Sequence, residues 1–357
     1  MAPVFAYVGC RTTRERNARG KGIGVYAVDP SSGAWVRVES FEALENPSFL
    51  ALNDAQDILY AVHGDGADVS SYAINATTGK LIALNRQPCE GRNPVHLALS
   101  RNGGALVIAN YATGNAAQLP INLDGSLGSV ASSVQFPGAA GPHGIEQGSS
   151  HPHHISRFAT RRYNTDWHII PDKGLDTVFA VKWDSADGTA ILTSGRAREG
   201  AGPRHAVFHP TLAMIYVSNE LDSTLTAWSF DPLTGALEPL HTISVLPNDW
   251  HVLSRAAGIA IRPDGSTLYV SNRGHDSIAT VELDGTTGIP LRARWTDAQG
   301  QCPRFICLSH DARMLYVANE QSDSIVQYLL DAKTGAPSPT GHVISTGSPV
   351  CITFKTH

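Results

Sequence analysis

The stretch RAAGIAIRPDGSTLYVSNR, residues 255–273, predicts two short strands joined by an Asp-Gly turn. Its second half recurs along the chain as FAYVGC (5–10), LYAVHG (59–64), LVIANY (106–111), WHIIPD (167–172), IYVSNE (215–220), LYVSNR (268–273) and LYVANE (315–320). We mark these copies at Tyr7, Tyr60, Val107, His168, Tyr216, Tyr269 and Tyr316, which lie 47 to 61 residues apart. Repeats of this kind, built from several short strands, are typical of propeller blades. The sequence therefore predicts an all-β fold, a seven-bladed β-propeller.

A partner strand precedes most of these segments and opens with a proline. It starts at Pro47, Pro94, Pro152, Pro203 and Pro303, and without a proline at Arg255. The last copy, SPVCITF (348–354), has no second strand after it, and FAYVGC has no partner strand before it. We therefore expect the C-terminal strand to pair into the N-terminal blade. This pairing closes the ring of a single domain, residues 1–357, and leaves no open sheet edge at the seam.

Composition narrows the class of protein. The chain has 33 glycines and 21 prolines, which suits many short strands and tight turns. The net charge of −5 gives no reason to expect a nucleic acid or an anionic membrane as partner. No apolar run approaches the roughly 18 residues of a membrane span. The five cysteines show no CxxC spacing and favour a reducing compartment. We expect a soluble, cytoplasmic protein, either a monomer or a weak homo-oligomer.

The antiparallel pairing of the two strands predicts where a site lies. The start of the proline strand and the end of its partner meet at one edge of the blade, so the ring gathers these residues around one mouth of the central channel. The residues after the opening positions are Ser48, Val95, His153, Arg204, Ala257, Arg304 and Val350. The residues that close the second strands are Cys10, His63, Tyr111, Asp172, Glu220, Arg273 and Glu320. The charged members come mainly from blades four to seven, which predicts a site for a small anionic ligand.

Plainer interpretations compete with a functional one. Arginines and glutamates in adjacent blades could form an ion-pair belt that only orders the loops. The uneven spread of charge and the presence of a histidine, which titrates near neutral pH, favour a functional cluster. The histidines of GPHGIEQGSSHPHH (141–154) suggest a metal, but His153 and His154 alternate to opposite sides of a strand and cannot easily share one ion. The asparagines before the rim are expected to hydrogen-bond the backbone of the repeated turn; they are Asn110, Asn219, Asn272 and Asn319.

Longer strings resemble a known family. EGAGPRHAVFHP (199–210), IYVSNELDSTLTAW (215–228) and SRAAGIAIRPDGSTLYVSNR (254–273) resemble the lactonase family of seven-bladed β-propellers, of the 6-phosphogluconolactonase and carboxy-cis,cis-muconate cyclase type. The opening YVGC (7–10) and GKGIGVYAVDPSSGAW (20–35) are similar to the first blade of that family, so the resemblance covers essentially the whole chain. It implies lactone chemistry in the channel mouth, without a metal or an organic cofactor. It also implies catalytic residues at His153, Arg204, Glu220 and Arg273.

The fourth blade departs from the repeat. SRFATRRYNTDWHIIPD (156–172) replaces the short Asp-Gly turn, so the strand register is open there. A slip of two residues would put His151 in the place of His153. The insertion also carries Arg157, Arg161, Arg162 and Tyr163, either as a solvated loop or as additional substrate contacts.

The predicted rim offers the groups that lactone hydrolysis requires, a base that activates water and donors for the developing oxyanion. His153 or Glu220 can serve as the base, and our hypothesis is that His153 does while Glu220 orients the arginines or the water. The arginines of the rim can stabilise the oxyanion or bind a carboxylate or phosphate. The candidate substrate-binding residues are Arg304, Glu320, Asp172, Lys173 and His63, of which Arg304 and Lys173 suit an anionic tail.

Three functions compete at this point. The first is hydrolysis of a small anionic sugar-acid lactone, with 6-phosphogluconolactone as the leading candidate because the strings of blades five and six most resemble that enzyme. The second is a cycloisomerase that closes an unsaturated tricarboxylate such as carboxymuconate into a lactone, with the same side chains. The third is a propeller without enzymatic activity that binds a partner protein. It would expose aromatic residues around the rim, where Tyr111 is the one obvious example.

Overall fold

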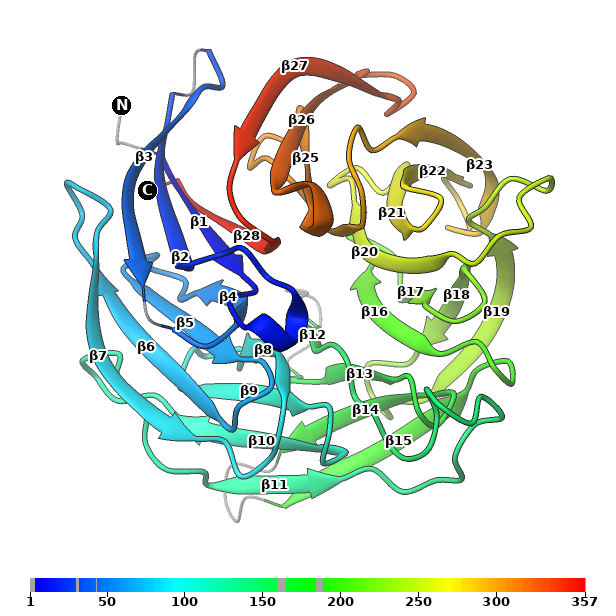
Figure 1. Cartoon of the computed structure of the whole chain (residues 1–357). Coiled ribbons are helices and arrows are strands. Elements are labelled where there is room, and N and C mark those ends of the chain that lie inside the picture. Colours follow the sequence, from blue (N-terminus) through cyan, green and yellow to red (C-terminus); the bar gives the residue numbers. More distant parts are fainter. Residues whose placement is uncertain (1–3, 30–31, 43, 159–164, 184–188, 357) are drawn as a thin grey trace.

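The computed structural model describes residues 4–29, 32–42, 44–158, 165–183 and 189–356. Seven four-stranded antiparallel sheets are arranged around a central axis as the blades of a propeller (Figure 1). In every blade the strand at the opening position lies innermost, and its marked partner lies next to it. The prediction of an all-β, seven-bladed propeller is confirmed.

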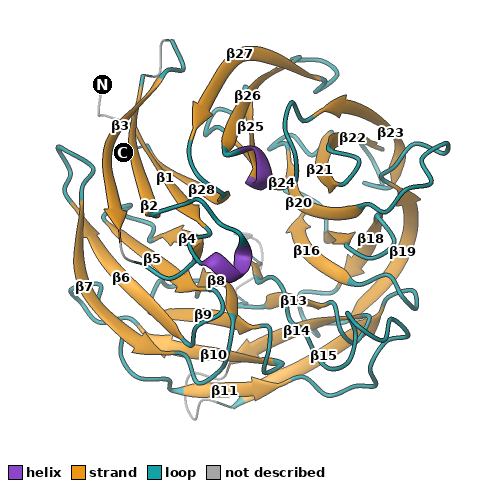
Figure 2. Ribbon diagram, viewed as in Figure 1, coloured by secondary structure: helices purple, strands orange, loops and turns teal. Residues whose placement is uncertain are grey.

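The strand bounds follow blade by blade, from the channel outward. Blades one to four contain β28 (Pro349–Lys355), β1 (Val4–Cys10), β2 (Gly22–Val28) and β3 (Trp35–Glu42); β4 (Pro47–Leu52), β5 (Ile58–His63), β6 (Asp68–Ile74) and β7 (Leu81–Pro88); β8 (Pro94–Leu99), β9 (Ala105–Asn110), β10 (Asn115–Pro120) and β11 (Ser132–Gln135); and β12 (Ser156–Arg157), β13 (His168–Asp172), β14 (Thr177–Trp183) and β15 (Ala190–Arg196). Blades five to seven contain β16 (Pro203–Phe208), β17 (Met214–Asn219), β18 (Thr224–Phe230) and β19 (Leu237–Ser244); β20 (Arg255–Ile261), β21 (Thr267–Arg273), β22 (Ser277–Leu283) and β23 (Pro290–Asp297); and β24 (Pro303–Leu308), β25 (Met314–Asn319), β26 (Ser324–Leu330) and β27 (Pro337–Ser345). Two short 3-10 helices, η1 (Arg14–Arg16) and η2 (Glu320–Ser322), lie near the central opening (Figure 2).

The ring closes as predicted, through the two ends of the chain. Strand β28 pairs antiparallel with β1 from Phe5↔Lys355 to Cys10↔Pro349, so the first blade takes its inner strand from the C-terminus (Figure 1). Strand β28 also packs against β4 and β24, the inner strands of the neighbouring blades. The seam therefore has the same layered packing as the rest of the ring.

Three of the five tyrosines that mark second strands connect neighbouring blades. Tyr7, Tyr216 and Tyr269 are buried, and each donates a hydrogen bond of 2.7–2.9 Å to a turn carbonyl of the next blade. The acceptors are Gly79, Gly288 and Gly335. These glycines have φ angles of +71°, +71° and +66°, which a residue with a Cβ adopts only with strain. At these three places, the tyrosine of one blade and the Thr-Gly turn of the next are thus the two halves of one contact between blades.

The hydrophobic core lies between the blades. One cluster joins blades two and three through residues such as Tyr60 and Leu97, and another joins blades four and five through Ile169 and Trp228. Burial of each large apolar side chain contributes roughly 1.5–3 kcal/mol. The inner strands are therefore held rigidly, and with them the side chains at the channel mouth. No helix in the described ranges is long and apolar enough to cross a membrane.

Blade four keeps its register in spite of the insertion. Its inner strand β12 has only two residues, but an isolated bridge pairs Pro152 with Asp172, as Pro203 pairs with Asn219 in blade five. Arg157 donates a hydrogen bond of 2.9 Å to the carbonyl of Ser100 and so ties the insertion to blade three. Arg161, Arg162 and Tyr163 lie outside the described residues.

Candidate active site

The strand pairing determines which side chains reach the channel mouth. Pro94, Pro203 and Pro303 pair with Asn110, Asn219 and Asn319, so the residues that follow these asparagines lie at the rim. They are Tyr111, Glu220 and Glu320, in agreement with the prediction. In blade six, Ala256 pairs with Asn272, and Arg273 takes the corresponding place.

The asparagines before the rim order the turns. The side-chain amides of three of them, Asn110, Asn272 and Asn319, donate hydrogen bonds of 2.8–3.1 Å to backbone carbonyls 21 to 27 residues away in the sequence. This confirms their predicted role in the repeated turn. Asn219 differs, because its amide donates to the hydroxyl groups of Thr224 and Thr226.

In blades one, two and four, the residue predicted to close the second strand at the rim lies one position before the residue that the structure places there. Pro349, Pro47 and Pro152 pair with Cys10, His63 and Asp172 themselves, which therefore correspond to the asparagines of the other blades. The rim residues of these three blades are Arg11, Gly64 and Lys173. The sequence contained a signal for this register. Glu220, Arg273 and Glu320 each lie four residues after their marker tyrosine, and the same count from Tyr7 gives Arg11.

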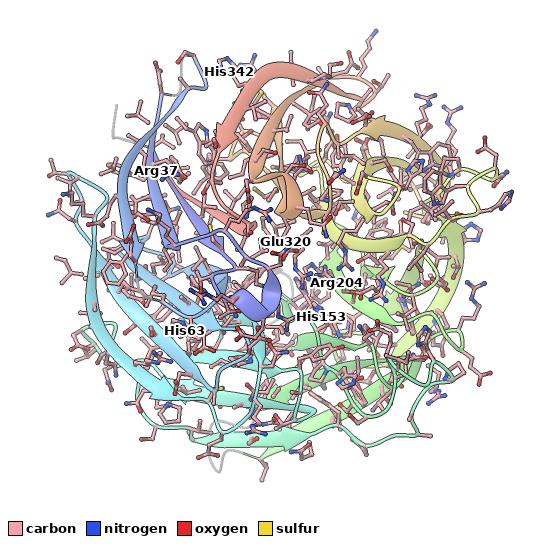
Figure 3. All side chains as sticks on the ribbon, viewed as in Figure 1. Arg37, His63, His153, Arg204, Glu320 and His342 are labelled. Atoms are coloured by element: carbon pink, nitrogen blue, oxygen red, sulfur yellow. The ribbon has the colours of Figure 1, made fainter. Side chains whose placement is uncertain are left out.

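His63 and Asp172, both predicted to bind substrate, are instead engaged with the protein. His63 is buried, and its Nδ1 donates to the carbonyl of Glu45 at 3.0 Å while Nε2 lies 2.8 Å from Ser70 Oγ. Figure 3 shows it farther from the central opening than His153 and Arg204. Asp172 is also buried, and its Oδ1 accepts backbone N–H groups of His151, Gly174 and Leu175 at 2.8–3.0 Å. Both side chains therefore order the loops behind the rim.

Glu220 is the centre of a buried ion cluster. Its Oε2 lies 2.8 Å from Arg204 Nε and 2.9 Å from Arg273 Nη2, and its Oε1 lies 3.3 Å from Lys173 Nζ. Burial alone would raise the pKa of Glu220, but Arg273, Lys173 and Arg204 outweigh burial and hold the pKa well below its usual value. The Arg204 N–H does not point along the line to the carboxylate, so this contact is an ion pair without hydrogen-bond geometry. Glu220 is therefore an ionised anchor for the cations around it.

A second carboxylate, Glu146, covers this cluster from the β11–β12 connection. It accepts hydrogen bonds from Lys173 Nζ at 2.7 Å and from Arg255 Nη2 at 2.6 Å. Arg255 in turn approaches Glu220 at 3.5 Å, so blades four, five and six are connected through one network. Neither Glu146 nor Arg255 was predicted from the sequence as a site residue. Glu146 belongs to a connection without a counterpart in other blades, so no repeat could indicate it.

His153, the residue after Pro152, lies at the inner end of the channel mouth, which we call the floor. It is buried, and burial together with the neighbouring Arg204 lowers its pKa well below the usual value, so the imidazole is neutral at neutral pH. Its Nδ1 is buried without a hydrogen-bond partner among the described residues. His151, the alternative, stacks on the ring of Tyr111 at 4.4 Å and donates from Nδ1 to the carbonyl of Tyr111 at 2.9 Å. The register thus places His153, and not His151, beside Arg204.

A water-sized cavity of about 20 Å³ lies at this floor. Its lining includes the residues after the opening positions of six blades, which confirms that these residues converge; they are Ser48, Val95, His153, Arg204, Arg304 and Val350. Arg11 lines it as well. Four of the lining side chains are buried and carry a polar atom without a hydrogen-bond partner in the described part of the chain: Arg11 Nη1, Ser48 Oγ, His153 Nδ1 and Arg204 Nη1. Four such atoms at one small cavity can be satisfied by a water molecule or by a polar ligand there.

A larger cavity of about 540 Å³ opens above the floor and shares Arg304 with it. Arg273 and Glu320 also line this cavity, together with residues of the β1–β2 connection. Arg304 Nη1 lies 3.5 Å from Glu320 Oε2. Figure 3 shows Glu320, Arg204 and His153 gathered around the central opening.

Three further histidines form a layer in the channel. His96, His154 and His205, which we call the channel histidines, have ring centroids 3.8 Å (His96–His154) and 4.5 Å (His154–His205) apart. Burial lowers the pKa of each of them, to about 3 for His154. His96 and His154 accept backbone N–H groups of the next blade, at 3.2 and 3.5 Å. In the described ranges, no three His, Cys, Asp or Glu side chains are arranged to hold a metal ion.

This arrangement can support reactions at a carbonyl group. A neutral imidazole can accept a proton, and guanidinium groups with unpartnered N–H donors can stabilise a developing oxyanion. The buried carboxylate holds the guanidinium groups in place before any ligand binds. The floor accepts an atom the size of an oxygen, and the cavity above it accepts the remainder of a small molecule.

Comparisons with known proteins agree with this fold. The chain matches the family described as "Lactonase, 7-bladed beta-propeller" over residues 5–354. It is similar to 6-phosphogluconolactonase of Bacillus subtilis (strain 168), with 31% identity over 309 residues, 85% of this chain and 84% of that protein. A solved structure of a Lactobacillus plantarum protein has a TM-score of 0.89 at 26% identity and covers 99% of this chain and 100% of its own. The periplasmic gluconolactonase of Pseudomonas aeruginosa has a TM-score of 0.88 at 25% identity, with 99% of each chain covered.

Proposed function

Because the chain belongs to the family of seven-bladed β-propeller lactonases, we propose that it hydrolyses the lactone of a sugar acid at the channel mouth. The observation that carries the proposal is the floor, where neutral His153 and the guanidinium of Arg204 both have unpartnered polar atoms at one small cavity. Glu220 fixes Arg204 and Arg273 on one carboxylate oxygen. A base and preorganised positive charge at one point are the two requirements of ester hydrolysis.

In the proposed reaction, His153 accepts a proton from water while the water oxygen bonds to the carbonyl carbon of the lactone. The former carbonyl oxygen becomes an oxyanion, which Arg204 and Arg273 stabilise. The ring C–O bond then breaks, and the alkoxide that leaves takes the proton from His153. The product is an open-chain hydroxy acid, whose carboxyl group releases one proton at neutral pH.

Glu220 has a positioning role in this scheme. Its low pKa makes it a weak base, because its carboxylate lies against Arg204, Arg273 and Lys173. Burial and the neighbouring Arg204 also lower the pKa of His153, which reduces its basicity, but its imidazole is uncharged at neutral pH and its Nδ1 has no hydrogen-bond partner among the described residues. We therefore propose His153 as the base and Glu220 as the group that holds the arginines.

We further propose 6-phosphogluconolactone as the leading substrate. The name of the Bacillus subtilis relative supports a phosphorylated lactone, whereas the name of the Pseudomonas aeruginosa relative supports a plain one. The test is a pH-indicator assay of the purified protein with 6-phosphogluconolactone and with gluconolactone, each corrected for spontaneous hydrolysis. Faster proton release from the phosphorylated lactone is the expected result. If the protein releases no protons from either lactone but converts carboxymuconate, the reaction at this site is lactone formation and not hydrolysis.

A further inference from the structure

The cavity above the floor is lined by several arginines. Four arginines line it, namely Arg16, Arg19, Arg273 and Arg304, whereas Glu320 is the single carboxylate among its described lining residues. Arg16 and Arg19 belong to the β1–β2 connection that carries η1, which lies near the central opening in Figure 2. The four guanidinium groups thus come from three blades, which are one, six and seven. Each of the four has a carboxylate partner, so an anionic ligand would bind through the N–H donors that these ion pairs leave free.

Arg19 fixes the cavity wall. Its Nε pairs with Asp323, and its Nη2 donates to the carbonyl of Gln321 at 2.8 Å. Both partners belong to blade seven, so Arg19 ties the β1–β2 connection across the seam of the ring. The position of Arg16, three residues earlier, is thereby fixed relative to Arg304.

The other three arginines keep donors for a ligand. Arg16 forms a forked pair with Asp65 through Nε and Nη2, and its Nη1 makes no hydrogen bond within the described residues. Arg304 has a single ion contact, with Glu320 at 3.5 Å, and no hydrogen bond in the same part of the chain. Arg273 contacts Glu220 through Nη2, while its buried Nε is unpartnered.

From this geometry we infer that the cavity above the floor is a subsite for the phosphate monoester of the substrate, with Arg16 and Arg304 as its principal ligands. This inference rests on the proposed function and assigns the residues that bind the phosphate group of its leading substrate. A phosphate dianion presents three oxygens in different directions, which suits guanidinium groups that converge from several blades. The floor takes the lactone carbonyl beside His153, and Arg304 lines both cavities, so a short sugar chain connects the two positions.

The test compares selectivity in matched arginine variants. The ratio of kcat/KM for 6-phosphogluconolactone to kcat/KM for gluconolactone is measured for the wild type, Arg16→Gln, Arg304→Gln and Arg86→Gln. Arg86 is the control for Arg16. It donates to Asp68 through the same atoms, Nε and Nη2, and is similarly exposed, but it lies on the outer strand of blade two. Loss of one charged hydrogen-bond donor should lower the ratio roughly 10- to 100-fold in Arg16→Gln and Arg304→Gln. Arg86→Gln should keep the wild-type ratio.

A binding measurement separates this inference from the proposed function. Calorimetric titration of inorganic phosphate needs no turnover, and phosphate should bind the wild type and Arg86→Gln more tightly than the two cavity variants. If the wild type hydrolyses neither lactone but binds phosphate in this pattern, the proposed function fails and the anion subsite stands. If it hydrolyses both lactones with a ratio that Arg16→Gln and Arg304→Gln leave unchanged, the subsite is refuted and the lactonase stands.

Discussion

Replacement of Glu220 by glutamine tests the buried ion cluster directly. The substitution keeps the shape of the side chain and removes the charge that faces Arg204, Arg273 and Lys173. Because Arg204 Nε and Arg273 Nη2 contact the same oxygen at 2.8 and 2.9 Å, these nitrogens lie within about 5.7 Å of each other. Two unit charges at that separation repel by about 3 kcal/mol at an effective dielectric constant near 20. Removal of one partner of a buried ion pair typically costs about 3–5 kcal/mol, which agrees with this value.

The assay is thermal unfolding followed by calorimetry. With an unfolding entropy of about 2.1 cal/mol/K per residue, a loss of 3–5 kcal/mol lowers the Tm of a chain of this length by roughly 4–7 °C. The control is Glu282→Gln, which removes an exposed partner of Arg292 and should cost less than about 1 kcal/mol, or roughly 1 °C. Added phosphate should restore part of the Tm of Glu220→Gln, since it supplies the missing negative charge. A Tm for Glu220→Gln no lower than that of Glu282→Gln would refute the ion-cluster account.

Three further outcomes follow from the same structure. Arg11→Gln, at the floor cavity, should lower kcat/KM for the lactone at least about tenfold with a Tm close to that of the wild type; unchanged kinetics would remove Arg11 from the site. Because the channel histidines have pKa values below their unfolded value of about 6.5, the unfolded chain binds more protons in acid. The unfolding free energy should therefore fall as the pH drops below 6.5, by up to about 1.4 kcal/mol per pH unit for each histidine; urea titrations with a flat profile from pH 7 to 5 would contradict this. Gly288→Ala, at φ +71° and with Met214 Sδ 2.8 Å from the added Cβ, should cost more than about 1 kcal/mol in urea unfolding, whereas Gly285→Ala meets open space and should not.

The fold could be predicted from the sequence because one local unit repeats. The marker tyrosine, the opening proline and the Thr-Gly turn each recur in most blades, and each has a contact that explains its recurrence. Tyr216 donates to the turn of the next blade, and Pro203 opens the strand that lines the channel. A repeated contact leaves a repeated residue, so the number of blades and the closure at β28 could be read before the structure was known.

The rim residue that closes the second strand could be predicted where an asparagine precedes it in the repeat. In blades five to seven the asparagine before the rim fixes the register, and Glu220, Arg273 and Glu320 were found. In blade one, Cys10 takes the place of that asparagine. The rim position was therefore assigned to Cys10 instead of to the next residue, Arg11. Glu146 could not be found at all, because its contacts with Lys173 and Arg255 depend on how a unique connection folds over three blades.

In the proposed mechanism, His153 is the base of a lactonase. Its most direct test is the turnover of His153→Ala on the lactone that the wild type hydrolyses fastest, with His151→Ala as the matched control. Loss of a general base should lower kcat by about 10²–10⁴-fold. His151→Ala should stay within a few-fold of the wild type, since that ring stacks on Tyr111 away from the floor cavity. Wild-type turnover by His153→Ala would contradict the account.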